Sequence, residues 1–154
     1  MKILKASAIC VLFSICYFSS SAQDELPLNE PDYNKPHLFS DMPQKMKLRI
    51  SNLEDLLDLP VGASVKTFIT DNFNFHGIVV STSDAANTTV KSVVIRSTNR
   101  KGATLTFTKT IKPDGTVKYL GRIMSLKNGD AFEIVKENDQ YILQKKILYD
   151  LINE

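Results

Sequence analysis

The sequence predicts a mostly β protein: a single antiparallel β-meander, closed into a small barrel or folded into a sandwich. A short helix precedes the meander in this prediction, and a half-helix follows it. Seven segments after Gly62 are rich in β-branched and aromatic residues, as strands are. Turn motifs such as Pro113-Asp114-Gly115 and Asn128-Gly129 lie between them and supply the positive φ that tight hairpins need.

The predicted strands follow one another at short intervals, which favours antiparallel pairing of sequence neighbours. They are Val65–Ile69, Phe73–Ser81, Val90–Ser97, Ala103–Ile111, Thr116–Ser125, Asp130–Val135 and Tyr141–Lys145. We interpret Asn128-Gly129 as the turn of a hairpin, in which Asp130 accepts N–H groups of the turn itself.

The expected helices lie at the two ends of the meander. Ser51 and Glu54 have the spacing of a capping box, in which each side chain satisfies a free N–H group of the first turn. The run ends at Pro60 and Gly62. Its apolar face is formed by Leu53, Leu56, Leu57 and Leu59. After the last strand, a half-helix is expected to pack Ile147, Leu148 and Leu151 onto an open end of the sheet.

The first 22 residues have the pattern of a secretory signal peptide. Lys2 and Lys5 precede a short apolar run, and Ser20 and Ala22 place small residues before a cleavage site. We therefore expect an exported protein, periplasmic or secreted, of bacterial type and without a membrane span after cleavage. Both cysteines lie in this segment, so residues 23–154 cannot form a disulfide or a zinc–thiolate site.

Two further parts are expected after the signal peptide. Residues 23–45 contain four prolines and few apolar runs, which is typical of an extended arm. This arm is either a spacer or a tail that inserts Tyr33, Leu38 and Phe39 into a partner. Residues 46–154 form the antiparallel β domain, and their number is enough for one core.

Charge is segregated along the chain. Residues 91–122 contain eight Lys and Arg against one Asp, whereas residues 23–60 contain eight acids against four bases. The basic segment predicts a face for an anionic partner, or a surface neutralised by the protein's own acidic segment. The candidate binding residues are Arg96, Arg100, Lys101, Lys109, Lys118 and Arg122.

No catalytic motif is present. The sequence has no metalloprotease helix, nucleophile elbow, phosphate loop or dinucleotide fingerprint, so we expect neither an enzyme nor a cofactor or metal site. His37 and His76 have no spacing that indicates a triad. The threonines at positions 104, 106, 108 and 110 share one face of a strand, which is typical of an ordinary exposed strand face.

A series of short motifs resembles a known module. They are Phe75-x-Gly77, Ser92-x-Val94, Gly121-x-Ile123, Gly129, Phe132-x-Ile134 and Tyr141-x-Leu143. They are similar to the prodomain-like β-meander module of bacterial secreted zinc metalloproteases and to small exported bacterial proteins of uncharacterised role. The resemblance covers residues 73–145 and implies a stand-alone module. The middle segment is longer and more basic than in that module, and no catalytic residue is carried over.

These observations predict a non-enzymatic exported binding domain. Its partner is a protein or an anionic polymer of the cell envelope, and nucleic acid is disfavoured because no aromatic residues interleave with the basic ones. One alternative is an inhibitor or chaperone-like partner of a secreted protease. Another is a small-ligand carrier that uses the interior of a barrel.

Overall fold

A computed structural model describes residues 36–83, 86 and 88–147. The chain divides into two compact units, residues 1–31 and 32–154, and all the described residues belong to the second. The expected signal peptide and most of the expected arm lie outside the described residues.

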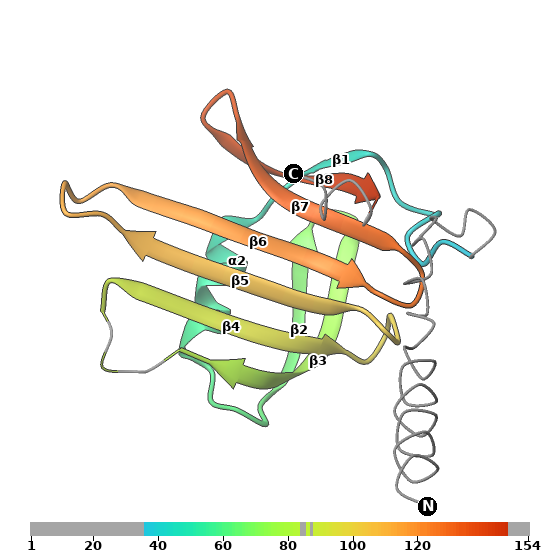
Figure 1. The fold of residues 1–154 in the computed structure, drawn as a ribbon, viewed down its shortest axis with the longest axis horizontal. Helices are drawn as coiled ribbons and strands as arrows, with labels where there is room; N and C mark the ends of the chain where they lie inside the picture. Colours follow the sequence, from blue (N-terminus) through green and yellow to red (C-terminus); the bar gives the residue numbers. More distant parts are fainter. Residues whose placement is uncertain (1–35, 84–85, 87, 148–154) are drawn as a thin grey trace, which may run out of the picture. The chain divides into compact units, whose positions relative to one another are not determined.

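The described strands form one antiparallel sheet of eight, in the order β1-β8-β7-β6-β5-β4-β3-β2 (Figure 1). From β2 to β8 each strand pairs with the next one in sequence, which confirms the predicted meander. The bounds are β1 Lys45–Lys47, β2 Ser64–Thr70, β3 Phe73–Thr82, β4 Val90–Ser97, β5 Thr104–Ile111, β6 Val117–Ser125, β7 Asp130–Glu137 and β8 Gln140–Ile147.

The sheet curls into a half-barrel and stays open, because β1 and β2 are edge strands that do not pair with each other (Figure 1). The closed barrel and the two-sheet sandwich are therefore both corrected to a single curled sheet. The two residues that follow β1 connect the two edges of the sheet through backbone hydrogen bonds. Leu48 donates its N–H to the Tyr141 carbonyl in β8 at 3.0 Å, and Arg49 donates its own to the Ile69 carbonyl in β2 at 2.8 Å.

The chain then forms α2 (Ile50–Glu54) and a 3₁₀ turn, η2 (Asp55–Asp58), against the inner face of the sheet. Leu53, Leu56 and Leu57 are buried there, as the predicted apolar face requires. The predicted capping box is wrong. The helix begins after Arg49 without a side-chain cap, so the Ser51 hydroxyl lies inside the first turn and bonds the Asn52 side chain instead.

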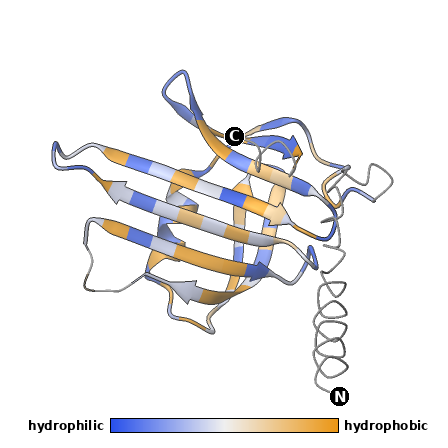
Figure 2. Ribbon diagram, in the orientation of Figure 1, coloured by the Kyte–Doolittle hydropathy of each residue, from blue (hydrophilic) through white to orange (hydrophobic). Residues whose placement is uncertain are grey.

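Residues alternate between the two faces of each central strand, which the alternating colours of Figure 2 make visible. In β4 and β5 the inward residues Val93, Ile95, Leu105 and Phe107 are fully buried. Their outward neighbours are mainly threonines, Ser92, Val94 and Arg96, which are half-buried or exposed. The core is therefore solid along the middle of the sheet, where the described side chains fill the interior.

Two glycines on the inner face let neighbouring strands approach closely. A Cβ atom at Gly77 would lie 2.6 Å from the Arg96 carbonyl oxygen, and one at Gly121 would lie 2.6 Å from the Thr106 carbonyl oxygen. Only glycine fits such an approach, and a side chain at either position would force the curled strands apart.

Residues 36–44, here called the strap, cover one end of the inner face. Phe39 is buried against Phe132 and Phe73, with ring centroids 5.1 and 6.4 Å apart. The Lys145 ammonium donates to the Phe39 and Met42 carbonyls, each at 2.6 Å. Phe39, which one of the two interpretations of the arm assigns to a partner, thus inserts into the protein's own core.

Asp130 holds the strap, which corrects its expected role. Gly129 does turn the β6–β7 hairpin, with φ of +69°. However, Asp130 is buried and accepts from the Phe39 N–H at 3.1 Å and pairs with His37 Nδ1 at 2.5 Å, so it does not serve its own turn.

β8 continues as a strand to Ile147, whose side chain is half exposed. This residue therefore does not begin the expected C-terminal half-helix. The rest of that prediction, including Leu148 and Leu151, lies outside the described residues.

Candidate functional site

The six candidate binding residues do not share one surface. Arg96, Lys118 and Arg122 lie on the outer face of β4 and β6, where the alternation directs their side chains away from the core. Lys109 lies on the inner face of β5. Arg100 and Lys101 lie in the turn between β4 and β5.

Three basic residues of segment 91–122 are neutralised by acids of the segment 23–60, as one of the two sequence alternatives predicted. Arg100 forms a double contact with the Asp41 carboxylate, at 3.0 and 2.5 Å, and donates to the Leu38 carbonyl. The Arg100 guanidinium lowers the pKa of Asp41. The other two pairs are Lys91 with Asp58 at 2.6 Å and Lys109 with Glu54 at 2.5 Å.

The outer face of β4, β5 and β6 remains basic. These three strands contain no Asp or Glu. Arg96 and Lys118 form no ion pair with any described residue, and Arg122 reaches the Glu133 carboxylate of β7 only at 3.8 Å. Two half-buried threonines of β5 lie between the two arginines, since Arg96 faces Thr104 and Thr106 faces Arg122. Thr108 and Thr110 continue the row of hydroxyls toward Lys118.

The inner face carries a second charged group where β5 and β6 pass the helix. The Glu54 carboxylate accepts from Lys109 Nζ and from the Tyr119 hydroxyl, the latter at 2.8 Å. These bonds lower the pKa of Glu54. Burial, and then the Glu54 carboxylate, raise the pKa of Tyr119 to about 12. Tyr119 also stacks on Phe107 at 5.8 Å, so the group is fixed by packing as well as charge.

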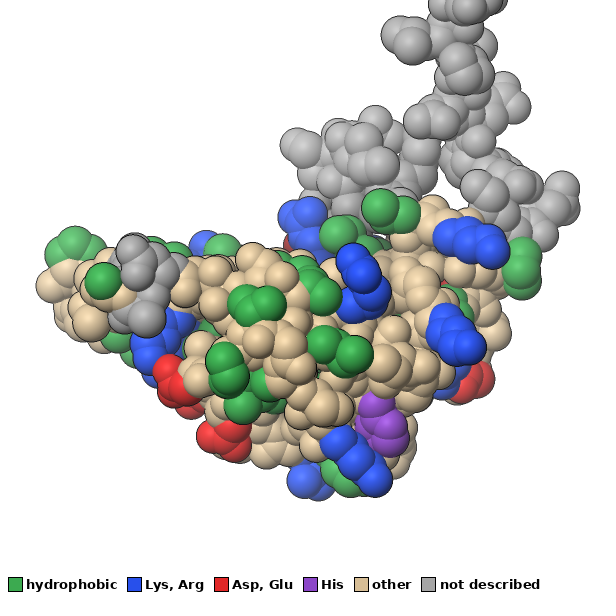
Figure 3. Space-filling model, turned by 90° about the horizontal axis from the view of Figure 1, so that it is seen from below, with side chains coloured by type: hydrophobic (Ala, Val, Ile, Leu, Met, Phe, Trp, Pro, Cys, Tyr) green, Lys and Arg blue, Asp and Glu red, His purple; other side chains and the backbone are tan. Residues whose placement is uncertain are grey.

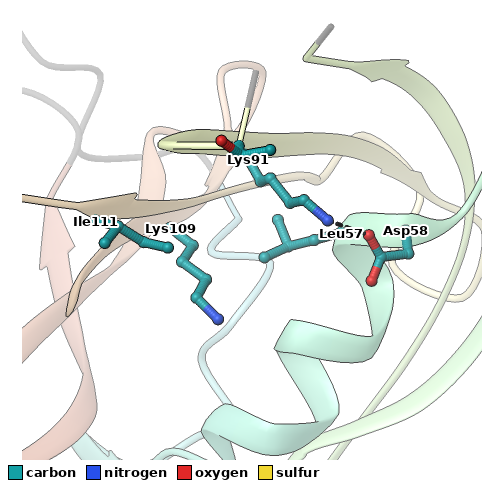
Figure 4. Close-up of a pocket in the computed structure, with 6 residues that line it drawn as sticks. Leu57, Asp58, Lys91, Lys109 and Ile111 are labelled. Atoms are coloured by element: carbon teal, nitrogen blue, oxygen red, sulfur yellow. Dashed lines mark hydrogen bonds and ion pairs between the residues drawn. The ribbon is translucent and has the colours of Figure 1, made fainter. Parts of the chain in front are cut away.

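A pocket of about 210 Å³ opens beside this group. Its lining combines two residues of η2 with residues of β4, β5 and the loop before β4: Leu57, Asp58, Thr88, Lys91, Lys109 and Ile111. In Figure 4 the Lys91 side chain extends past Leu57 to Asp58. Lys91 and Lys109 are direct cross-strand partners, an arrangement that needs carboxylates nearby because like charges repel.

The face seen from below carries a group of exposed hydrophobic side chains. Figure 3 shows them in the middle of this face, bordered by Asp and Glu as well as by Lys and Arg side chains. On the outer side of β2 and β3, Phe68 and Ile78 are partly exposed. The register places the Lys66–His76 pair between them, so they are not continuous.

The two histidines have different surroundings. His37 pairs with Asp130, and no serine hydroxyl is bonded to it within the described residues. His76 is on the outer face of β3, where its Nε2 atom and the Asn74 Oδ1 atom are buried without a hydrogen-bond partner. Among the described residues, no group of three or more His, Cys, Asp and Glu side chains is arranged to hold a metal ion.

Comparisons with family models, curated proteins and solved structures find no match to this chain. The fold and the charged surfaces define its class: a β-domain built on one open, curled meander, with a basic outer face and a charged pocket at one end of its inner face. Within the part of the chain that the structure describes, no helix has the length and hydropathy to cross a membrane.

Proposed function

We propose that this protein is an exported, non-enzymatic binding domain that holds an anionic polymer on the outer face of β4, β5 and β6. The observation that carries the proposal is the charge of this face. Arg96, Lys118 and Arg122 project from strands that contain no acid, and the first two have no ion-pair partner in the described residues.

The charge balance of the domain supports this proposal. The described residues include sixteen Lys and Arg side chains and ten Asp and Glu side chains, an excess of six positive charges. Lys91, Arg100 and Lys109 are already paired with carboxylates, so the excess is contributed by other cations, including those of the outer face. Lys101, in the exposed turn after β4, extends the basic face toward one end.

The geometry favours an extended ligand. Threonine hydroxyls on alternate residues of β5 are spaced about 7 Å apart along the strand. Arg96 and Arg122 stand two strands apart on either side of them, about 10 Å across the sheet. A chain bearing regularly spaced carboxylate or sulfate groups would contact guanidinium, ammonium and hydroxyl donors in turn.

The experiment measures binding of the purified protein to polygalacturonate and to dextran sulfate by calorimetry, at low and at raised salt. We expect binding that weakens as salt rises, because all three cations are exposed. The triple variant R96E/K118E/R122E should lose it.

The matched control is K47E/K66E/K127E, which changes the net charge equally at exposed lysines that form no ion pair with described residues. Equal loss in both triple variants would mean that only net charge matters and would overturn the assignment to this face. Retained binding in R96E/K118E/R122E would do the same.

The alternative of an inhibitor or chaperone-like partner of a secreted protease rests on the sequence resemblance. Complex formation between this protein and a co-secreted metalloprotease would favour it over polymer binding. Export itself is proposed from residues 1–22, which lie outside the described residues.

A further inference from the structure

The pocket at the end of the inner face is a second candidate binding site, on the opposite side of the sheet from the basic face. We infer that it binds an apolar α-amino acid, with the ligand's carboxylate on Lys91, its ammonium group on Asp58 and its side chain against Leu57 and Ile111. This inference does not depend on the proposed function, because the two sites share no residue.

The size and lining of the pocket suit a small ligand with one apolar part. Its volume of about 210 Å³ lies below the roughly 300–1,000 Å³ of sites for drug-sized molecules. Leu57 is buried beneath it, and Ile111, at the end of β5, is 38% exposed and forms an apolar wall. Together they offer a surface for one aliphatic side chain.

The charges of the pocket point to a zwitterion. Lys91 and Lys109 contribute two positive charges, and Asp58 and Glu54 contribute two negative ones. A simple carboxylate that bound Lys91 would leave Asp58 without its partner, and a simple amine that bound Asp58 would leave Lys91 without its own. An α-amino acid carries both charges on one carbon and satisfies both groups.

The two ion pairs of the site differ in how easily they open. The Asp58 side chain is 73% exposed and the Lys91 side chain 39% exposed, so their pair is of the kind that contributes little to stability. Lys109 and Glu54 are less exposed, and Glu54 is also held by Tyr119. A ligand can therefore enter between Lys91 and Asp58 while the pair of Lys109 and Glu54 stays in place.

The test is a titration of the isotopically labelled protein with L-leucine, followed by amide chemical shifts. We expect shifts confined to residues around 57–58, 88–91 and 109–111, with a Kd of about 1 mM or tighter. Three analogues each lack one recognised group: 4-methylpentanoate lacks the amine, isopentylamine lacks the carboxylate, and glycine lacks the apolar side chain. Each should bind at least about tenfold more weakly.

Two variants test whether the chemical shift changes with leucine depend on Lys91. Lys91→Met keeps the apolar stem and removes the ammonium group, and it should weaken leucine binding by about tenfold or more. Lys66→Met makes the same change at an exposed lysine of β2, outside both candidate sites, and should leave leucine binding unaltered. The amide spectrum of each variant shows directly whether it is folded.

Three results would overturn the inference. The first is the absence of any shift with leucine at concentrations well above 1 mM. The second is equal binding of leucine and 4-methylpentanoate, which would make the site one for simple carboxylates. The third is unchanged leucine binding in folded Lys91→Met. None of these results bears on binding of polymers to the outer face, which is measured separately.

Discussion

The two ends of the inner face differ in what covers them. At one end the strap lies over Phe73 and Phe132, and its backbone is bonded to side chains of the sheet. At the other end, η2 leaves a pocket whose charged groups bond other side chains and, among the described residues, no backbone group of a covering segment. The same strands, β4 and β5, run from the first end to the second (Figure 1).

The difference shows two ways of using charge in one small domain. At the strap end, Asp130 and Lys145 bond backbone N–H and carbonyl groups of the strap, so they fix a segment of chain. At the pocket end, the partly exposed Lys91 and Asp58 side chains meet each other, so this pair can exchange partners without moving the backbone. Charged groups at the strap end thus stabilise the fold, whereas the charged pair of Lys91 and Asp58 at the pocket end is exposed to solvent.

The largest expected effect is the removal of the Phe39 ring. Phe39 is 1% exposed, so Phe39→Ala should lower the free energy of unfolding by about 3–5 kcal/mol, through lost burial and the cavity that remains. Urea denaturation measures this change. Phe68→Ala is the matched control, because Phe68 is 49% exposed and should cost much less. Equal losses would show that the strap does not complete the core.

A smaller effect is expected when Asp130 loses its charge. Asp130→Asn keeps the size of the side chain but weakens its bonds to the Phe39 N–H and to His37. The free energy of unfolding should fall by about 1–3 kcal/mol. Asp139→Asn, at a 95% exposed turn carboxylate where φ is +60°, should change it by less than about 0.5 kcal/mol. Denaturant curves of the two variants would contradict the assignment if they coincided.

The smallest effect concerns the pocket end and appears in alkali. Because the pKa of Tyr119 is raised to about 12, the neutral phenol favours the folded state. That contribution is present below about pH 10, where a free tyrosine ionises, and is lost as the pH rises to about 12. The phenolate absorbance of the folded protein should show a step near pH 12 that Tyr119→Phe removes.

Glu54→Gln tests the cause of this late titration, since the Glu54 carboxylate is one reason why the pKa of Tyr119 is raised. The late step should move to lower pH in this variant and remain visible. Should the step stay near pH 12 without the carboxylate, burial alone would account for the raised pKa of Tyr119.

Most of the sheet was predictable from local sequence. The alternation of β-branched residues and the residues at the turns were enough to place seven strands close to their observed bounds. Asn138 and Asp139, for example, adopt the positive φ values of a tight turn. β1 was missed because its three residues, Lys-Met-Lys, carry no strand signal and pair with β8 only through tertiary contact.

The candidate sites were less predictable, because they depend on which residues meet across the fold. The sequence raised the neutralisation of the basic segment as an alternative, but it could not match Lys91 with Asp58 or Arg100 with Asp41. The pocket depends on the position of η2 over β4 and β5, which no local pattern encodes. The predicted capping box failed for the same reason: Glu54 bonds Lys109 and Tyr119 across the core instead of its own helix.

The pairing of β1 with β8 differs from every other pairing in the sheet in the length of chain that it closes. Neighbouring strands from β2 to β8 are joined by short connections, whereas Lys47 meets Ile142 across almost the whole domain. The entropy of loop closure grows with the logarithm of loop length, so closing this loop in the unfolded chain would cost about 3 kcal/mol more than closing a hairpin. Prior formation of the meander removes most of that cost, because it fixes most of the chain between the two strands. The meander from β2 to β8 can therefore form through contacts between neighbours in sequence. β1 can pair only after β8, the last strand of the chain, is in place.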